Sequence, residues 1–286
     1  MIKKSTFLHL RFPFSFFLLP VFLFAVAIDQ PEFGLQFWLV FFILHFLLYP
    51  ASNGYNSYFD KDEQSIGGLK NPPKVSHELY YISWGMDLLA IVLGLWISWE
   101  FAMMLFIYGL VSKAYSHPKI RLKKMPIVGW LAAGIFQGYF TFLMVIVGLE
   151  GGMNGVWQWP VQFPAMLTTM LLFGSYPMTQ IYQHEEDSRR GDRTMSLILG
   201  IMGTFHFTAA FFTVSVGMYC WYFISFYEPS IAMYFLAALS PVLLFFGWWY
   251  LQSRKNLNHV NFQNTMRLNL LSSLCLNLFF LYLSFS

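Results

Sequence analysis

Charged residues are scarce in this chain of 286 residues. Only 11% of its residues are Asp, Glu, Lys or Arg, whereas a soluble domain carries about 25%. Hydrophobic residues make up 57% of the chain and aromatic residues 21%. This composition excludes an ordinary soluble domain and indicates a polytopic integral membrane protein.

Cysteine is also rare, with only two residues in the chain, so sites built from several cysteines are not expected. Cys220 and Cys275 both lie in apolar runs, so neither a disulfide framework nor a cysteine metal cluster is indicated. The net charge of +3 is small, and the basic residues do not cluster on a soluble face. We therefore expect no nucleic-acid partner.

Long apolar runs dominate the rest of the sequence. A helix needs about 20 such residues to cross a bilayer. Runs of this kind fall near 12–28, 34–51, 80–98, 101–115, 126–148, 161–181, 204–224, 231–251 and 268–285. The sequence thus predicts an all-α bundle of nine transmembrane helices, organised as a single polytopic membrane domain over residues 1–286.

The loops between these runs differ sharply in charge. All 17 basic residues fall before the first run, after the even-numbered runs or, for Lys113, near the end of the fourth run. The opposite gaps hold only acids, namely Asp29, Glu32, Glu100, Glu150 and Glu228. The positive-inside rule then places the N-terminus and the even-numbered loops in the cytoplasm, as in a bacterial-type inner membrane.

The N-terminal segment has two interpretations. Lys3 and Lys4, an apolar run and Ala25-Val26-Ala27 resemble a cleavable signal peptide. However, Arg11 extends the basic part, and Pro13 interrupts the apolar run. We therefore favour a retained first helix, and the predicted orientation of the rest is the same in both cases.

Two acidic segments follow apolar runs on the predicted cytoplasmic side. In the first, Asn56, Asp60 and Gln64 recur every four residues, so a continuing helix would place them on one face. Glu63 flanks that face and Asp62 points away from it. Carboxylates at a membrane boundary suggest divalent cations and, through them, a phosphorylated substrate.

The second acidic segment repeats this spacing. Gln183 and Asp187 are four residues apart, with Glu186 beside them. Two helix ends can thus present facing oxygen ligands of the kind that Mg²⁺ prefers. The alternative is that both segments are solvated helix ends. The candidate metal ligands are Asn56, Asp60, Glu63, Gln64, Gln183, Glu186 and Asp187.

The order of the motifs resembles the UbiA superfamily of intramembrane prenyltransferases. Residues 56–64 occupy the place of the family's first acidic motif, after its second helix. Residues 115–123 are similar to its Y-S-x-P-x-x-R-L-K stretch, and residues 183–187 to its second motif, after helix six. Residues 191–194 and Arg11-Phe12-Pro13 also fit the family pattern.

The resemblance implies transfer of an isoprenyl group from a prenyl diphosphate to a lipophilic acceptor, often an electron-rich aromatic ring. Mg²⁺ would bridge the diphosphate to the two acidic motifs, with Asp60 and Asp187 as the catalytic carboxylates. Fixed cations would stabilise the negative charge on the leaving group. The expected cations are Lys119, Arg121 and Lys123, followed by Lys70 and Arg193, although loop topology alone also explains basic residues at these positions.

The sequence departs from the family pattern at Gln64, Gln183 and Ser57, where acidic residues are usual. Glutamine offers a neutral oxygen but no charge toward a metal ion. Glu63 and Glu186 can substitute, because each lies beside or near an altered position. If they do not, the chain is a divergent member with weak activity.

A transporter or lipid-binding membrane protein is a further alternative. Asp87 lies inside the third apolar run, where a carboxylate faces the bundle interior. It is either a base near the acceptor or a structural, hydrogen-bonded acid. Transporters often place their sites at mid-membrane between two internal repeats. Here both acidic segments lie near the boundary and on the same side, which favours the prenyltransferase.

Overall fold

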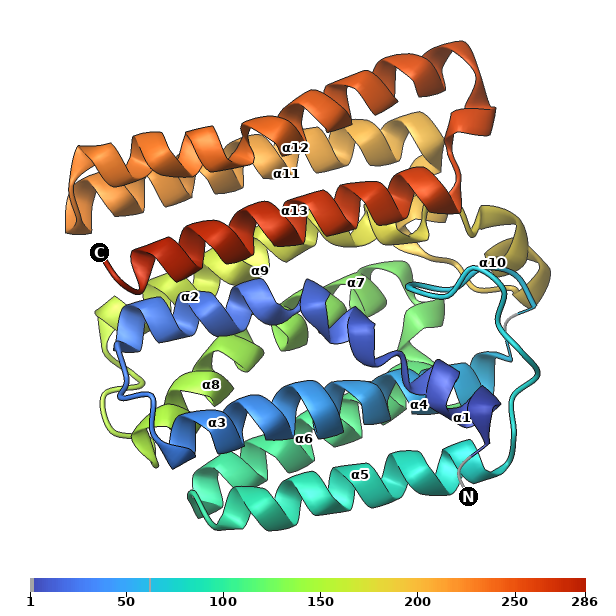
Figure 1. Ribbon diagram of the computed structural model, residues 1–286. Coiled ribbons are helices and arrows are strands. Elements are labelled where there is room, and N and C mark those ends of the chain that lie inside the picture. Colours follow the sequence, from blue (N-terminus) through green and yellow to red (C-terminus); the bar gives the residue numbers. More distant parts are fainter. Residues whose placement is uncertain (1–2, 62) are drawn as a thin grey trace.

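The computed structural model of the protein describes residues 3–61 and 63–286. These residues form helices and loops, with one isolated bridge between Ile66 and Leu69. Figure 1 shows long helices running side by side, with α1 and α10 at one end of the bundle and the C-terminus at the other. The all-α fold predicted from the sequence is therefore confirmed.

The helices follow the expected apolar runs. Their bounds are α1 Lys4–Leu10, η1 Phe12–Phe17, α2 Leu19–Asp29, α3 Leu35–Phe42, η2 Ile43–Leu48, α4 Tyr49–Asp60, α5 Glu78–Leu95, α6 Trp99–Ser116, η3 Leu122–Lys124, α7 Pro126–Ile135, η4 Phe136–Phe140, α8 Thr141–Glu150, α9 Trp159–Gln180, α10 His184–Arg190, α11 Met195–Phe226, α12 Pro229–Lys255, η5 Leu257–His259 and α13 Phe262–Leu283. The segments η2 and η4 are π-helical turns that join α3 to α4 and α7 to α8.

Six helices in the described part of the chain are long and apolar enough to cross a membrane. They are Leu35–Asp60, Glu78–Leu95, Pro126–Glu150, Met195–Phe226, Pro229–Lys255 and Phe262–Leu283. A bent pair, Lys4–Phe17 with Leu19–Asp29, passes the same test when taken as one span. The expected spans 101–115 and 161–181 correspond to α6 and α9, which are helical but outside this set. The count of nine therefore stays a prediction.

The second span ends later than its apolar run, and this matters for the site. The helix continues through α4 to Asp60 and stops at Lys61, whose backbone is left-handed (φ 50°). Asn56 and Asp60 therefore share a helical face, as the four-residue spacing predicts. Gln64, expected on the same face, instead lies beyond the end of the helix.

An aromatic cluster closes the core at the end remote from α10. Phe24 of α2 stacks on Phe280 of α13, with 4.5 Å between ring centroids. The rings of Phe142 in α8 and Tyr219 in α11 lie 5.6 and 5.5 Å from Phe24. All four side chains are almost fully buried. Aromatic contacts of this kind add to the burial of apolar area, so the cluster holds four helices together.

The π-helical turn η4 approaches α9 very closely at Gly138. A Cβ built on Gly138 would lie 2.7 Å from the backbone nitrogen and Cα of Thr169. The hydroxyl of Thr169 also accepts a hydrogen bond from the backbone N–H of Tyr139 at 2.8 Å. Glycine at this position therefore lets α9 pack against the α7–α8 helix.

We predict that Gly138→Ala lowers the thermal unfolding midpoint in detergent. The added methyl group must push two backbones apart, and overpacking of this kind costs about 1–3 kcal/mol. Gly217→Ala in α11 is the matched control, because nothing lies within 4 Å of a Cβ there. Equal midpoints for the two variants would contradict the close approach at Gly138.

Candidate functional site

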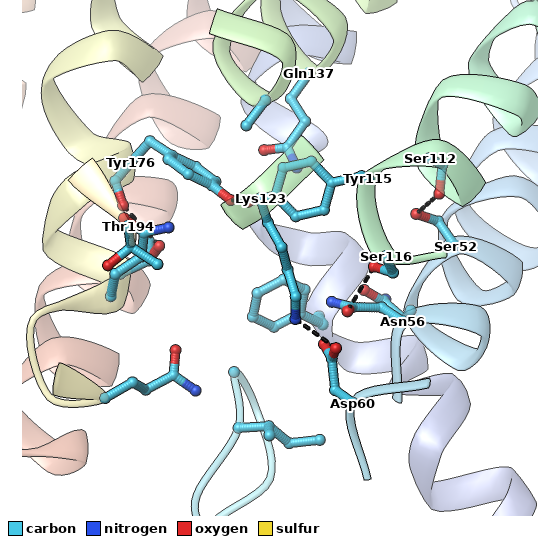
Figure 2. Close-up of a pocket in the computed structure, with 18 of the residues that line it drawn as sticks. Ser52, Asn56, Asp60, Ser112, Tyr115, Ser116, Lys123, Gln137, Tyr176 and Thr194 are labelled. Carbon is cyan, nitrogen blue, oxygen red and sulfur yellow. Dashed lines mark hydrogen bonds and ion pairs between the residues drawn. The ribbon is translucent and has the colours of Figure 1, made fainter. Parts of the chain in front are cut away.

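A cavity of about 220 Å³ lies where α4, α6, α9 and α10 end. Both acidic segments contribute to it, through Asn56 and Asp60 from α4 and through Gln183 and Asp187 at α10. Lys123, in the loop before α7, also lines it. In Figure 2 the Lys123 side chain runs down the middle of this space toward Asp60, and Thr194 lies on the opposite wall. We call this space the polar cavity.

Asp60 ends α4 with a carboxylate that is 4% exposed. Its Oδ1 forms an ion pair with Lys123 Nζ and lies 3.8 Å from Nη2 of Arg121. A buried carboxylate is stable only when cations or hydrogen-bond donors compensate for lost hydration. The two cations therefore determine whether Asp60 can remain charged at the membrane boundary.

Arg121 is held in turn by Asp192, which is 1% exposed. Its Nε and Nη2 donate to the two carboxylate oxygens of Asp192 at 2.9 and 2.8 Å. Lys123 Nζ lies 3.9 Å from the same carboxylate. Asp60, Arg121, Lys123 and Asp192 thus form a cluster of two anions and two cations, which we call the charge cluster. Bidentate arginine–carboxylate pairs fix geometry as well as charge.

Asn56 is positioned by the packing of α4 against α6. Its Oδ1 accepts a hydrogen bond of 2.8 Å from the Ser116 hydroxyl, and one turn earlier Ser52 and Ser112 bond to each other (Figure 2). Two polar contacts on one helix face fix the rotation of α4. That rotation directs Asn56 and Asp60 into the polar cavity.

Asp187 lies in the first turn of α10, outside the membrane-spanning segments. Its Oδ2 accepts a hydrogen bond of 3.2 Å from the Thr194 hydroxyl. Burial raises the pKa of the Asp187 carboxyl to about 7; the negative charge of Asp192 adds to the rise, while Thr194, Lys123 and Arg190 oppose it. The neighbouring cations therefore do not fully compensate for the burial of the Asp187 carboxylate. A bound cation would add the missing positive charge.

The other predicted metal ligands lie outside the cavity lining. Glu186 is buried, pairs with Arg190 and accepts a 3.3 Å hydrogen bond from the backbone N–H of Glu63. This contact fastens the loop after α4 to α10. The side chains of Glu63 and Gln64 are exposed, and Asp62, expected to point away, lies outside the described residues.

The departures from the family pattern fall at different places in the structure. Gln183 lines the polar cavity and donates from Nε2 to the backbone oxygen of Ser65 at 3.4 Å. Ser57 is buried in α4, and Gln64 is exposed after it; neither lines the cavity. Among these three positions, only Gln183 changes the charge of the cavity wall itself.

The predicted diphosphate-binding cations also separate into two groups. Lys123 lines the cavity and Arg121 reaches the carboxylates of Asp60 and Asp192. Lys119, Lys70 and Arg193 are exposed and do not line it. Between Lys119 and Lys123 the chain turns at Arg121 in a left-handed conformation (φ 44°).

Sequence reasoning missed two groups that the structure brings to the site. Asp192 belongs to the Gly191–Thr194 stretch, and an acid beside a basic residue in so acid-poor a chain was the available signal. Arg11 lines the cavity and donates to the backbone oxygens of Gly67 and Asn53 at 3.1 and 3.3 Å. The signal in the sequence was the fit of Arg11-Phe12-Pro13 to the family pattern, which assigns no role in binding to Arg11.

Asp87 lies apart from the cavity. It forms an ion pair with Lys113 between α5 and α6, and neither residue lines the polar cavity. The ammonium group of Lys113 also lies 4.5 Å from the ring centre of Trp84 and 5.1 Å from that of Tyr55. The structure therefore favours the structural role for Asp87 over a role as a base.

Oxygen ligands for a metal ion are present, although few are charged. No group of three or more His, Cys, Asp or Glu side chains within residues 3–61 and 63–286 is arranged to hold a metal ion. Mg²⁺ often binds through one or two carboxylates and completes its shell with substrate phosphates and water. Asp60 and Asp187, with the amide oxygens of Asn56 and Gln183, fit that mode of binding.

Comparison with known proteins decides the family. The model of the UbiA prenyltransferase family matches residues 17–271. The chain belongs to this family. No curated protein matches the sequence.

Solved structures of UbiA homologues share the fold. A homologue from Aeropyrum pernix K1 superposes with a TM-score of 0.71 at 15% identity, covering 94% of this chain and 97% of that one. A homologue from Archaeoglobus fulgidus bound to GPP and Mg²⁺ gives 0.66 at 16% identity, covering 99% and 100%. A digeranylgeranylglyceryl phosphate synthase gives 0.61 at 18% identity, covering 99% and 97%. Long apolar helices and this membership together make the chain an integral membrane protein.

We predict that Asp192→Asn strongly destabilises the fold. The substitution removes the buried Asp192 carboxylate from the partly buried cations Arg121 and Lys123, and breaking a buried ion pair costs about 3–5 kcal/mol. Thermal unfolding in detergent measures the effect.

The matched control is Glu185→Gln in α10. The Glu185–Arg189 pair is largely exposed, and exposed pairs contribute only about 0–1 kcal/mol. If both variants unfold at the wild-type temperature, the charge cluster does not hold the loops together.

Proposed function

We propose that this protein transfers an isoprenyl group from a prenyl diphosphate to a lipophilic acceptor within the membrane, in a reaction that depends on Mg²⁺. The observation that carries the proposal is the meeting of Asp60, Asp187 and Lys123 in one cavity, although the two acids are far apart in sequence. The archaeal homologue bound to GPP and Mg²⁺ supports the same chemistry on this fold.

In this proposal, Asp60 and Asp187 hold Mg²⁺ with help from Asn56 and Gln183. When bound, Mg²⁺ supplies Lewis-acid stabilisation of the charge that develops on the departing diphosphate. With Asp60 holding the metal ion, Lys123 would no longer be needed to compensate the Asp60 carboxylate, with which it forms an ion pair in the structure. The ammonium group can turn to the phosphate oxygens without leaving a buried carboxylate unpaired.

The reaction breaks the bond between the first carbon of the isoprenyl group and the diphosphate oxygen. Both electrons leave with the diphosphate, the acceptor supplies a new electron pair to the allylic cation, and the acceptor then releases a proton. The cation must be protected from water and is stabilised by aromatic faces. Tyr108, Tyr115, Phe136 and Tyr176 line the polar cavity and can serve this purpose.

We place the polar cavity at the cytoplasmic side of the membrane. The loops at this end of the bundle carry the basic residues that set orientation under the positive-inside rule. Among them are Lys61, Lys70 and Arg189. The acids Asp29 and Glu150 are the last residues of α2 and α8, at the other end of the bundle.

Binding of a prenyl diphosphate to the detergent-purified protein tests the proposal without knowledge of the acceptor. We expect binding that requires Mg²⁺ and that weakens at least tenfold in Asp60→Asn and in Asp187→Asn. Asp29→Asn is the control, because this acid lies away from the cavity. Binding that is independent of metal, or no binding at all, would identify a divergent member that has lost diphosphate chemistry.

A second prediction separates Lys119 from Lys123, two of the candidate lysines. Lys123→Gln removes a cation that lines the cavity, so the affinity for inorganic diphosphate in the presence of Mg²⁺ should fall at least tenfold. Lys119→Gln removes an exposed cation four residues away and should change that affinity less than twofold. Equal losses would mean that the general positive charge of the loop binds the diphosphate.

A further inference from the structure

The polar cavity joins a second cavity, which is lined by uncharged side chains. This second cavity, of about 190 Å³, lies between α2, α9, α11 and α13, and we call it the apolar chamber. The residues that line both spaces form the junction between them. Within residues 3–61 and 63–286, no charged side chain lines this junction. The charges of the site are therefore confined to the polar cavity.

Three side-chain carboxamides reach the junction from three different membrane helices. Asn53 lies in α4, Gln137 in the π-helical turn η4 and Asn269 in α13, and each lines both spaces. In Figure 2 the Gln137 side chain lies at the opposite end of the view from Asp60. All three residues belong to candidate membrane spans, in which polar side chains are costly and usually functional.

These carboxamides form no hydrogen bond with any part of the chain that the structure describes. Other polar groups of the junction do have partners. The hydroxyls of Ser52 and Tyr176 bond to those of Ser112 and Tyr115, and the hydroxyl of Thr179 donates to a backbone oxygen. An amide taken from water without a partner is costly. The three free carboxamides therefore indicate a polar ligand at the junction.

The chemistry of a carboxamide limits what this ligand can be. Its oxygen accepts and its nitrogen donates hydrogen bonds, so it matches a hydroxyl or a carbonyl group. It carries no charge, so it cannot compensate a carboxylate or a phosphate that has lost its hydration. Lys123, Arg11 and Arg190 line the polar cavity but not the chamber. The junction is therefore suited to an uncharged group.

Aromatic rings form another part of the junction. Phe14 of η1, Tyr108 of α6 and Tyr176 of α9 line both spaces. Aromatic rings pack favourably against one another in offset or edge-to-face arrangements. A flat ring that carries hydroxyl groups therefore matches both the carboxamides and the rings of the junction.

The junction also lies close to the proposed reacting centre. Asn53 precedes Asn56, a proposed metal ligand, by three residues in α4, which is about 4.5 Å along the helix axis. The carbon that is transferred adjoins an oxygen of the diphosphate. An acceptor at the junction is therefore near that carbon while the diphosphate occupies the polar cavity.

We propose that Asn53, Gln137 and Asn269 bind the acceptor, and that this acceptor is an uncharged hydroxylated aromatic ring rather than a carboxylate or a phosphate ester. A ring carbon activated by the hydroxyl supplies the electron pair of the new bond. The diphosphate leaves with the electrons of the broken bond and takes up the proton that the ring carbon loses. The assignment rests on the proposed function and deepens it by naming the class of acceptor.

Two probes that differ in one charged group test this selection: naphthalene-1,4-diol, kept reduced, and its 2-carboxylate. Their dissociation constants are measured on detergent-purified protein saturated with Mg²⁺ and inorganic diphosphate. We expect the diol to bind at least tenfold more tightly than the carboxylate. Asn53→Leu, Gln137→Met and Asn269→Leu keep the side-chain size but remove a hydrogen-bonding group. Each should weaken diol binding at least threefold and leave the affinity for diphosphate within twofold of the wild type.

The matched control is Gln263→Leu, because Gln263 is an exposed carboxamide of α13 that lines neither space. Its affinity for the diol should equal that of the wild type. Gln137→Lys has the opposite purpose, since it places a cation at the junction. It should bind the carboxylate probe at least tenfold more tightly than the wild type does, which simple loss of packing cannot produce. Asn269→Lys replaces it if that variant does not fold.

Diphosphate binding separates the two ways in which the acceptor assignment can fail. A wild-type protein that binds diphosphate with Mg²⁺, but binds the carboxylate as tightly as the diol or binds neither probe, would overturn the assignment and leave the proposed function intact. Unchanged diol affinity in all three amide variants would do the same. Absence of magnesium-dependent diphosphate binding in the wild type would refute the proposed function, and the acceptor assignment with it.

Discussion

The charge cluster is the interaction on which the site depends. Asp60 ends α4, Arg121 and Lys123 lie before α7, and Asp192 lies between α10 and α11, so the cluster joins three loops at one end of the bundle. The two carboxylates are buried and the two cations partly buried at a membrane boundary, and opposite charges compensate for their lost hydration. Electrostatic attraction therefore helps to hold together the loops that carry the two acidic segments.

The cluster also links the resting site to its proposed chemistry. In the structure, Lys123 and Arg121 compensate Asp60, and these are the cations that a diphosphate would attract. In the proposed reaction, a metal ion at Asp60 and an anion at Lys123 would replace one ion pair with two, so we expect each ligand to strengthen the binding of the other.

Much of this arrangement follows from local sequence. The four-residue spacings of Asn56 with Asp60 and of Gln183 with Asp187 are helical periods, which depend only on neighbours along the chain. The pairing of Arg121 with Asp192 could not be predicted, because the sequence does not show which of several acids a distant arginine meets. The left-handed turns at Lys61 and Arg121 have no signal in the sequence either, and neither Gln64, which follows the first turn, nor Lys119, which precedes the second, lines the cavity.

A structure with a prenyl diphosphate and Mn²⁺ in place of Mg²⁺ would test the central claim most directly, because anomalous scattering locates the metal. We expect an ion bound to carboxylate oxygens of both Asp60 and Asp187 at about 2.1 Å, the distance typical of Mg²⁺. We also expect Lys123 Nζ to have moved from Asp60 to a phosphate oxygen. A diphosphate bound elsewhere, with Lys123 still paired to Asp60 and the two carboxylates without metal, would contradict it.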